Sequence, residues 1–246
     1  MKILVPISKV PDTTSKIAFA DGDTKFAEEG IQWIVNPYDE WYALVRALEL
    51  VEAGGGTVTV INVGGATSDP VIRKALALGA HEAVRIDTEA SESYVVAKEI
   101  AAYAADKGFD MVLLGKETIS YNGSEVGGML AEFMNVPYIS LASSLEVNGD
   151  SATMDRTIEG GVEVVDVKMP FVASASKGMA EQRIPNMRGI MAARTKPLTV
   201  VPASGANAKT AYVKYGLPAA KSVVKLVDPE NMDELVRLLH EEAKSI

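Results

Sequence analysis

The sequence predicts an α/β protein with a doubly wound, mainly parallel sheet, a β-hairpin extension and a C-terminal arm that ends in a helix. Three observations support this prediction. Short aliphatic runs alternate with helical segments from residue 2 to about 140, which is typical of parallel strands joined by crossover helices. Residues 144–174 alternate with a period of two around turn signals. The segment after residue 195 contains prolines and small residues and ends in an amphipathic helix.

The strands of the α/β part are predicted from brief runs of aliphatic and β-branched residues. The first, residues 2–7, is an aliphatic run ending near Pro6. The second, residues 57–63, is almost wholly β-branched. Further strands are expected at residues 83–86, 111–114 and 138–140.

Helices are predicted between these strands. In the first, residues 38–53, the proline that follows Asn36 suits the first turn, and the glycines at 54–56 end the helix. Others are expected at residues 69–78, 91–107 and 123–134. Asn122 or Ser124 is expected to cap the last of these, which would leave its free N–H groups available to a phosphate.

The hairpin and the arm follow this alternating part. Asn148-Gly149 is a strong turn signal, and Gly160-Gly161 marks a second turn. The arm is expected to end in a helix that begins at Asp228-Pro229-Glu230 and places Leu235, Leu238 and Leu239 on one face. We therefore predict a nucleotide-binding α/β domain at residues 1–195, including the hairpin and a loop near residue 187, and a separate arm at residues 196–246.

Composition limits the function classes. The chain has 246 residues, of which 48% are hydrophobic, enough for a substantial core. The net charge of −9 argues against nucleic acid as a partner. The absence of cysteine excludes disulfides and thiolate metal sites, and His81 and His240 lie far apart, so no metal site is expected. No apolar segment has the length of a membrane span or of a signal peptide, so we expect a cytoplasmic protein without direct membrane insertion.

Two pairs of acidic residues could suggest carboxylate sites. Asp39-Glu40 lies at the start of the first predicted helix, and Glu241-Glu242 lies in the last. Both pairs are expected on solvated helix surfaces.

Small residues follow three of the predicted strands. Pro6 ends the first, Gly64-Gly65 follows the second, and Gly115 follows the strand at 111–114. Ligands of doubly wound sheets bind at the carboxyl ends of the strands, and small residues let the backbone approach a ligand. Each glycine alone is typical of a turn, and neither a dinucleotide-binding fingerprint nor a Walker lysine is present. The three loops together predict a nucleotide pocket.

The segment from residue 156 to 174 has a specific pattern: a basic residue, an acid-Gly-Gly turn, an acid two residues later, an aliphatic residue, then proline and a small residue. The positions are Arg156, Glu159, Gly160, Gly161, Glu163, Val165, Pro170 and Ser174. In this order and spacing the chain resembles the beta subunit of the electron-transferring flavoproteins, from Ile3 to about Lys225.

The resemblance implies an AMP in this subunit and an FAD held mostly by an alpha subunit. The positions matched to the AMP site are Pro6, Asn36, Val63, Gly64, Gly115, Asn122, Gly123, Ser124, Val126 and Gly127. Asp12 and Thr13 match positions near the flavin ring. Family members that bifurcate electrons carry a second FAD in place of AMP. Residues 120–127 lack the acidic residues of both versions of this loop, and we favour AMP.

The resemblance also implies a docking loop at residues 181–191. The loop would bind flavin dehydrogenases of the acyl-CoA dehydrogenase type, with Met187 as the apolar anchor, and electrons would pass on to a membrane quinone oxidoreductase. The partner-binding positions are Arg183, Ile184, Met187, Ile190 and Met191. Taken alone, the residues favour a surface loop that packs Ile184 and Met187 on its own domain. The chain would be an electron carrier subunit without catalytic residues, not an enzyme.

Two other readings of the same residues remain open. A stand-alone adenine-nucleotide sensor of the universal-stress type would share the sheet and the glycine loops, but it would leave the loop at 183–191 and the long tail unexplained. A hydrolase or ATP pyrophosphatase of similar fold is the last choice, because its Ser/Gly/Asp-rich phosphate loop is missing after the first strand.

Overall fold

The computed structural model describes residues 1–90, 92–221 and 223–246 and divides the chain into two compact units. Unit 1 comprises Met1–Ile17 and Ala27–Val213, and unit 2 comprises Ala18–Phe26 and Lys214–Ile246. Unit 1 holds the α/β fold, including the predicted loops and hairpin.

The core of unit 1 is a parallel sheet, as the sequence predicted. Its order is β9 (Tyr138–Ala142), β13 (Phe171–Ala175), β8 (Met111–Gly115), β1 (Lys2–Pro6), β6 (Thr57–Val63), β7 (Glu82–Asp87) and β14 (Leu198–Pro202), and neighbours run parallel. β14 was not predicted, because the proline-flanked segment read as extended chain. It extends the sheet beyond β7.

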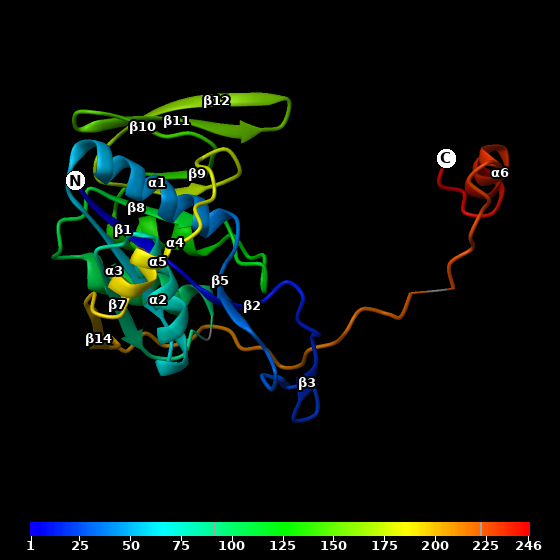
Figure 1. Cartoon of the computed structure of the whole chain (residues 1–246), viewed down its shortest axis with the longest axis horizontal. Coiled ribbons are helices and arrows are strands. Elements are labelled where there is room, and N and C mark those ends of the chain that lie inside the picture. Colours follow the sequence, from blue (N-terminus) through cyan, green and yellow to red (C-terminus); the bar gives the residue numbers. More distant parts are fainter. Residues whose placement is uncertain (91, 222) are drawn as a thin grey trace. The chain divides into compact units, whose positions relative to one another are not determined.

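Helices cover both faces of this sheet (Figure 1). α1 (Asp39–Gly54), α2 (Asp69–Leu78) and α5 (Met187–Ala193) contribute to one core cluster, and α3 (Ser93–Ala104) and α4 (Val126–Met134) to the other. β1 shows the alternation that divides them: Ile3 and Val5 face the first cluster and Leu4 faces the second, and all three are fully buried. The doubly wound fold class is thus confirmed.

The antiparallel extension matches the prediction over residues 146–168, whereas residues 171–174, predicted as its last part, belong to β13 of the parallel sheet. β10 (Glu146–Asn148) turns into β11 (Ser151–Ile158), which pairs with β12 (Gly161–Lys168) along its whole length. β11 joins the parallel sheet through Arg156, which pairs with Ala142 of β9. Figure 1 shows this hairpin at the opposite end of the sheet from β14.

Several predicted boundaries need correction. α4 begins at Val126, three residues later than predicted, and neither Asn122 nor Ser124 caps it: its N-cap is Glu125 and no side chain bonds to its first turn. The helix predicted at 91–107 is α3, which begins at Ser93; Ser91 lies outside the described residues. Short strands β2 (Lys9–Pro11) and β5 (Trp33–Val35), which pair with each other, and a 3-10 turn at Ala66–Ser68 were also not predicted.

Unit 2 contains the hairpin of β3 (Phe19–Ala20) and β4 (Lys25–Phe26) and the end of the chain. The Phe19 ring stacks on Tyr215 with centroids 5.1 Å apart. The last helix, α6 (Met232–Glu241), begins four residues later than the predicted Asp228, because Asn231 accepts the N–H of Glu234 and caps it.

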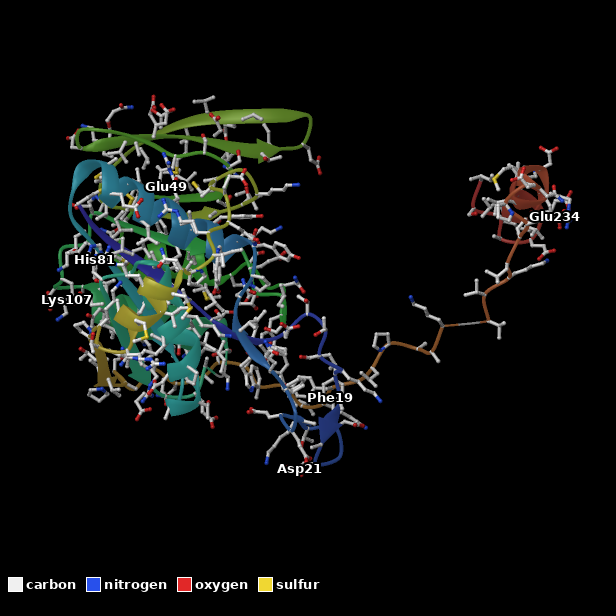
Figure 2. The ribbon with its side chains drawn as sticks, viewed as in Figure 1. Phe19, Asp21, Glu49, His81, Lys107 and Glu234 are labelled. Atoms are coloured by element: carbon white, nitrogen blue, oxygen red, sulfur yellow. The ribbon has the colours of Figure 1, made fainter. Side chains whose placement is uncertain are left out.

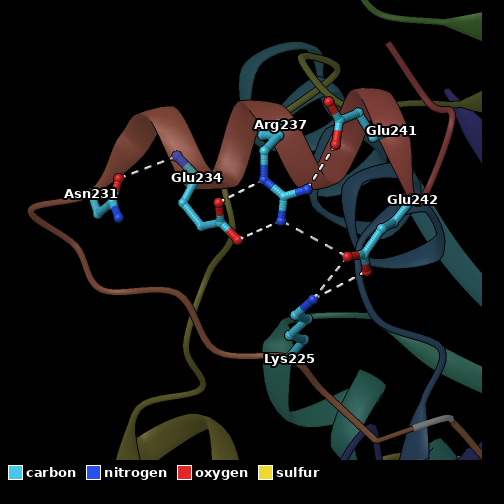
Figure 3. A network of polar contacts seen from close by, with 6 residues as sticks. All are labelled: Lys225, Asn231, Glu234, Arg237, Glu241 and Glu242. Carbon is cyan, nitrogen blue, oxygen red and sulfur yellow. Dashed lines mark hydrogen bonds and ion pairs between the residues drawn. The ribbon is translucent and has the colours of Figure 1, made fainter.

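Charged side chains stabilise α6 along its exposed face (Figure 3). Arg237 bonds to Glu234 one turn earlier and to Glu241 one turn later, and Lys225 bonds to Glu242. The predicted solvated pair Glu241-Glu242 is exposed, as expected. Of the face predicted to be apolar, Leu238 is buried and Leu239 half-buried, whereas Leu235 is exposed.

No helix in the described ranges is long and apolar enough to cross a membrane. Within the same ranges no group of three or more acidic or histidine side chains is placed to hold a metal ion. His81, labelled in Figure 2, has a structural role, because its Nδ1 accepts the backbone N–H of Val58 at 3.1 Å.

Candidate functional site

The strand order creates a crevice between β1 and β8. The chain runs from β1 to β6 and β7 on one side, then returns to β8 on the other side of β1. Ligands of open α/β sheets bind outside the carboxyl ends of the strands at such a switch point. The loops that follow Pro6, Val63 and Gly115 all leave from this edge of the sheet.

Asn36 fastens two loops at this edge. Its side chain is buried, its Nδ2 donates to the carbonyl oxygen of Glu117 at 3.0 Å, and its Oδ1 accepts the N–H of Ile119 at 2.9 Å. Both partners belong to the loop after β8, so Asn36 holds that loop against the start of α1. Asn36 does not cap α1, whose N-cap is Tyr38.

Glu40 is a site residue that the sequence analysis placed wrongly. It was expected on a solvated helix surface, but it is only 5% exposed and its Oε2 accepts the N–H of Ser8 at 2.7 Å. Burial raises the pKa of Glu40 to about 8; the Ser8 hydrogen bond opposes this rise and Asp39 adds to it. A protonatable carboxyl therefore lies directly under the crevice, between the end of β1 and α1.

Gly115 is required by this buried carboxyl. A Cβ atom at Gly115 would lie 2.7 Å from both the Cγ and the backbone nitrogen of Glu40. Such distances are too short for any side chain, so a glycine is needed where β8 passes the first turn of α1. Gly115 is recognisable in the sequence as a glycine at a strand end, but nothing local in the sequence indicates its contact with Glu40.

A pocket of about 290 Å³ opens between the start of α1 and the loop after β8. Its lining residues are Pro37, Tyr38, Asp39, Tyr42, Lys116, Glu117, Ile119, Asn122 and Lys177. Asn122 is the predicted nucleotide residue among them. Lys116 and Lys177 bring positive charge to the wall, and Asp39 and Glu117 bring negative charge. Lys116 pairs with Glu117 at 3.3 Å, so Lys177 is the lysine of this lining without an ion pair among the described residues.

Three residues around this pocket have left-handed backbone conformations although they are not glycine. The φ angles are 64° for Tyr38, 50° for Asn122 and 53° for Ser124. Conformations of this kind are costly for side chains other than glycine and concentrate at functional sites. Tyr38 is 54% exposed, so its ring is available to a ligand or partner.

The end of the loop after β8 is fixed by side-chain packing. Ser124 Oγ donates to the Glu117 carboxylate at 3.2 Å, and this hydrogen bond joins the beginning and the end of the loop. A Cβ atom at Gly127 would lie 2.7 Å from the Tyr138 hydroxyl, so this glycine lets α4 approach β9. Tyr138 in turn bonds to Ser174, the last residue of the sequence pattern at 156–174.

The loop after β6 is held by Arg85, which the sequence analysis also missed. Arg85 is buried, donates to the carbonyl oxygen of Gly64 at 2.9 Å, and pairs with Asp69 and Asp87. A Cβ atom at Gly64 would lie 2.6 Å from Ser68 Oγ and so has no room. Gly64 therefore belongs to a tightly packed turn at the site's edge.

The remaining predicted nucleotide positions do not line this pocket. Pro6 and Val63 are buried strand ends, Val126 packs against a core cluster, and a Cβ atom at Gly123 would make an ordinary 3.7 Å contact with the Glu125 side chain. Asp12 makes local contacts: its Oδ1 accepts both the N–H and the hydroxyl of Thr14, which lower the pKa of its exposed carboxyl. Thr13 is exposed beside it.

The predicted docking loop forms a second surface. Its tip is not a loop but the short helix α5, which begins at Met187 and is capped by Asn186. The exposed fractions are 92% for Ile184, 73% for Met187 and 56% for Met191. Ile190 is 41% exposed, so the predicted apolar positions lie on the surface and do not pack into unit 1.

Residues of α1 hold the start of this segment. Trp41 Nε1 donates to the carbonyl oxygen of Arg183 at 3.1 Å. The Arg183 guanidinium donates to both carboxylate oxygens of Glu52, at 2.8 and 2.9 Å. Figure 2 labels Glu49, which lies on α1 with its carboxylate 3.8 Å from the same guanidinium. Arg183 is thus engaged within the chain and orients the loop.

Residues of α2 hold the end of the segment. A Cβ atom at Gly189 would lie 2.3 Å from the carbonyl oxygen of Ala77, so α5 packs on α2 through a glycine. Arg73 donates to the carbonyl oxygens of Ala193 and Lys196, at 2.8 and 2.6 Å. The contacts with α1 and α2 therefore fix the position of the segment that carries the exposed apolar side chains.

Comparisons with known proteins agree with these features. The family model of the electron transfer flavoprotein domain matches residues 23–206. The chain is 35% identical to the electron transfer flavoprotein subunit beta of Bacillus subtilis, with all of both chains covered. It is also 35% identical to the subunit beta of Syntrophomonas wolfei, over 93% of this chain and 90% of that one, and 29% identical to that of Sus scrofa, over 98% and 97%. The chain belongs to the electron transfer flavoprotein family.

Proposed function

We propose that this chain is the beta subunit of a heterodimeric electron-transfer flavoprotein. The alpha subunit would hold most of the FAD, and the dimer would carry electrons from flavin dehydrogenases of the acyl-CoA dehydrogenase type toward a membrane quinone oxidoreductase. The full-length similarity to proteins named as beta subunits is the observation that carries the proposal. Because electron transfer between flavins requires proximity rather than acid–base groups, we assign no catalytic residue to this chain.

The crevice beside β1 and β8 is proposed to bind AMP. Its cavity of about 290 Å³ lies just below the range of about 300–1,000 Å³ usual for ligand sites, which suits a mononucleotide better than FAD. Lys116, Lys177 and Asn122 would hold the nucleotide, and Asn36, Gly64, Gly115 and Gly127 would shape the backbone around it. The sequence-predicted Pro6, Val63, Gly123, Ser124 and Val126 do not line this cavity, and they stay in the proposed set only through their match to the family's AMP site.

The FAD would supply the redox chemistry when bound, and this chain would supply surfaces. Asp12 and Thr13 are proposed to lie near the flavin. The arm at residues 196–246 is proposed to pack on the alpha subunit, because several of its apolar side chains are exposed. The docking surface, defined as Arg183, Ile184, Met187, Ile190 and Met191, is proposed to bind the dehydrogenase, with Met187 as anchor.

Bound nucleotide should be identified after denaturing the purified complex. We expect one AMP per chain in the unaltered protein and less in Gly115→Ala, because its Cβ would displace Glu40 and the first turn of α1. Gly161→Ala is the matched control, since it lies at the start of β12 in the hairpin, has nothing within 4 Å of its Cβ and has no left-handed φ. A second FAD would indicate an electron-bifurcating protein, and a colourless self-dimer would support the stand-alone sensor instead.

The docking surface should be tested with Met187→Ala. We expect kcat/KM for electron acceptance from the dehydrogenase to fall about tenfold, because truncating a central apolar anchor typically costs at least about 1–2 kcal/mol. The FAD content should stay the same. Val164→Ala, at a valine of β12 that is 66% exposed, should leave the kinetics unchanged. Equal rates for Met187→Ala and the unaltered protein would remove the anchor role.

A further inference from the structure

The backbone that follows β14 is held on α3 by a buried glutamate. Glu99 is 2% exposed, and its carboxylate accepts the backbone N–H groups of Ser204, Gly205 and Ala206 at 2.6, 3.1 and 2.9 Å. Burial alone would raise the pKa of Glu99, but these hydrogen bonds prevail and lower it. Glu99 therefore stays ionised and binds this stretch of backbone in the way a concave array of N–H groups binds an anion.

A second glutamate repeats the arrangement nearer the start of α3. The Glu92 carboxylate accepts the backbone N–H groups of Lys209 and Thr210 and the Thr210 hydroxyl. Glu92 is the N-cap residue of α3, yet its side chain makes no bond to the helix itself. Both carboxylates are thus directed at the chain between residues 204 and 210, which we call the strap.

Apolar packing contributes little to holding the strap. Ala203, just before it, packs against a core cluster, whereas of residues 204–210 all are exposed except the half-buried Ala206. A pocket of about 400 Å³, lined among others by Glu92, Tyr94, Lys209 and Tyr212, lies beside the strap. The strap is therefore held mainly by its hydrogen bonds to two carboxylates, with little apolar packing beneath it.

We infer that Glu92 and Glu99 are positioning residues for the C-terminal arm: they fix the strap and so determine where residues 214–246 leave unit 1 toward a partner subunit. The inference rests on the proposed function, in which the arm packs on the alpha subunit. A strap that is already ordered removes part of the conformational entropy loss that association would otherwise require. The expected consequence is tighter assembly without any contact between the glutamates and the partner.

The test uses the full heterodimer with Glu99→Gln, and Glu92→Gln as a second variant at a position nearer the surface. Amide hydrogen exchange at residues 204–210 should become at least about tenfold faster, because a neutral amide loses the charge-assisted hydrogen bonds. The dissociation constant for the alpha subunit should rise about tenfold. Glu132→Gln, at an exposed glutamate of α4, is the matched control and should change neither.

A double-mutant cycle with Leu226→Ser separates this inference from the proposed function. Leu226 is 89% exposed on the arm, so its replacement reports arm binding alone. Non-additive effects of Glu99→Gln and Leu226→Ser on dissociation support the positioning role of Glu92 and Glu99, which we call the latch, because both substitutions then act through the arm. Fast exchange in the strap with unchanged or additive dissociation overturns the latch while heterodimer formation still stands. If neither glutamate variant frees the strap, the latch is also overturned.

Discussion

Glu40 connects the chemistry of the crevice to the stability of the fold. Its carboxyl is buried where β1 and α1 meet, and burial raises its pKa from 4.5 to about 8. Between these pH values the folded chain retains a proton that the unfolded chain releases. The contribution of Glu40 to stability is therefore fully present below pH 4.5, declines as the pH rises toward 8, and levels off above that.

Glu40→Gln should flatten this decline. Glutamine keeps the size of the side chain and an oxygen that can accept the Ser8 N–H, but it carries no proton to lose. One titrating group changes the free energy of unfolding by at most about 1.4 kcal/mol per pH unit. Denaturant unfolding at pH 5 and pH 8 should thus show a smaller loss of unfolding free energy for the variant than for the unaltered protein. Equal losses would mean that Glu40 ionises in the folded chain as it does in the unfolded one.

Single residues also show how far the sequence can predict the site. Asn36 and Gly115 were found, and the structure gives each a specific contact. Glu40 was misplaced because an acidic pair in the first turn of a helix is normally favoured by the helix dipole and solvated. Its burial depends on β8, which joins the sheet far later in the sequence. Arg85 was missed for the same reason, since its partner Gly64 belongs to a different strand end.

Among secondary-structure elements, prediction succeeded where periodicity was strong. β6 and α2 have the predicted limits, because β-branched runs and capped amphipathic segments are determined locally. The helix α5 was read as a loop. A helix of seven residues has little stability of its own, and its formation depends on α2, which lies far away in the sequence.

The dependence of α5 on α2 gives a prediction for this element. Gly189→Ala introduces a Cβ that would lie 2.3 Å from the carbonyl oxygen of Ala77, so the helix must shift. Overpacking of this kind costs about 1–3 kcal/mol. We expect kcat/KM with the dehydrogenase to fall about tenfold while AMP content is unchanged. In Gly128→Ala the new Cβ makes an ordinary 3.8 Å contact with Tyr138, so this variant should behave like the unaltered protein. Unaltered kinetics in Gly189→Ala would show that the position of α5 is unimportant for docking.

At the scale of the whole molecule, the chain has more apolar surface than its own fold covers. Unit 1 has a continuous core on both faces of the sheet, whereas Val213, Leu217, Val223, Val224 and Leu226 follow one another along an exposed segment. Exposed apolar stretches of this length are typical of interaction surfaces. The sequence predicted the final helix of this segment, because its apolar and charged residues alternate with helical periodicity. A covering surface for the exposed side chains has no such local pattern.

Val223→Ser tests whether the arm contributes to assembly. Val223 is 97% exposed, so the free energy of unfolding of the isolated chain should not change. If the side chain becomes buried on the alpha subunit, its loss should cost about 1.5–3 kcal/mol, which corresponds to a dissociation constant at least about tenfold higher. Lys221→Ser, at an exposed lysine of the same arm, controls for changes in backbone flexibility. Titration of the labelled chain with the alpha subunit measures the dissociation constant of each variant. Equal affinities for Val223→Ser, Lys221→Ser and the unaltered chain would show that the arm is free in the complex.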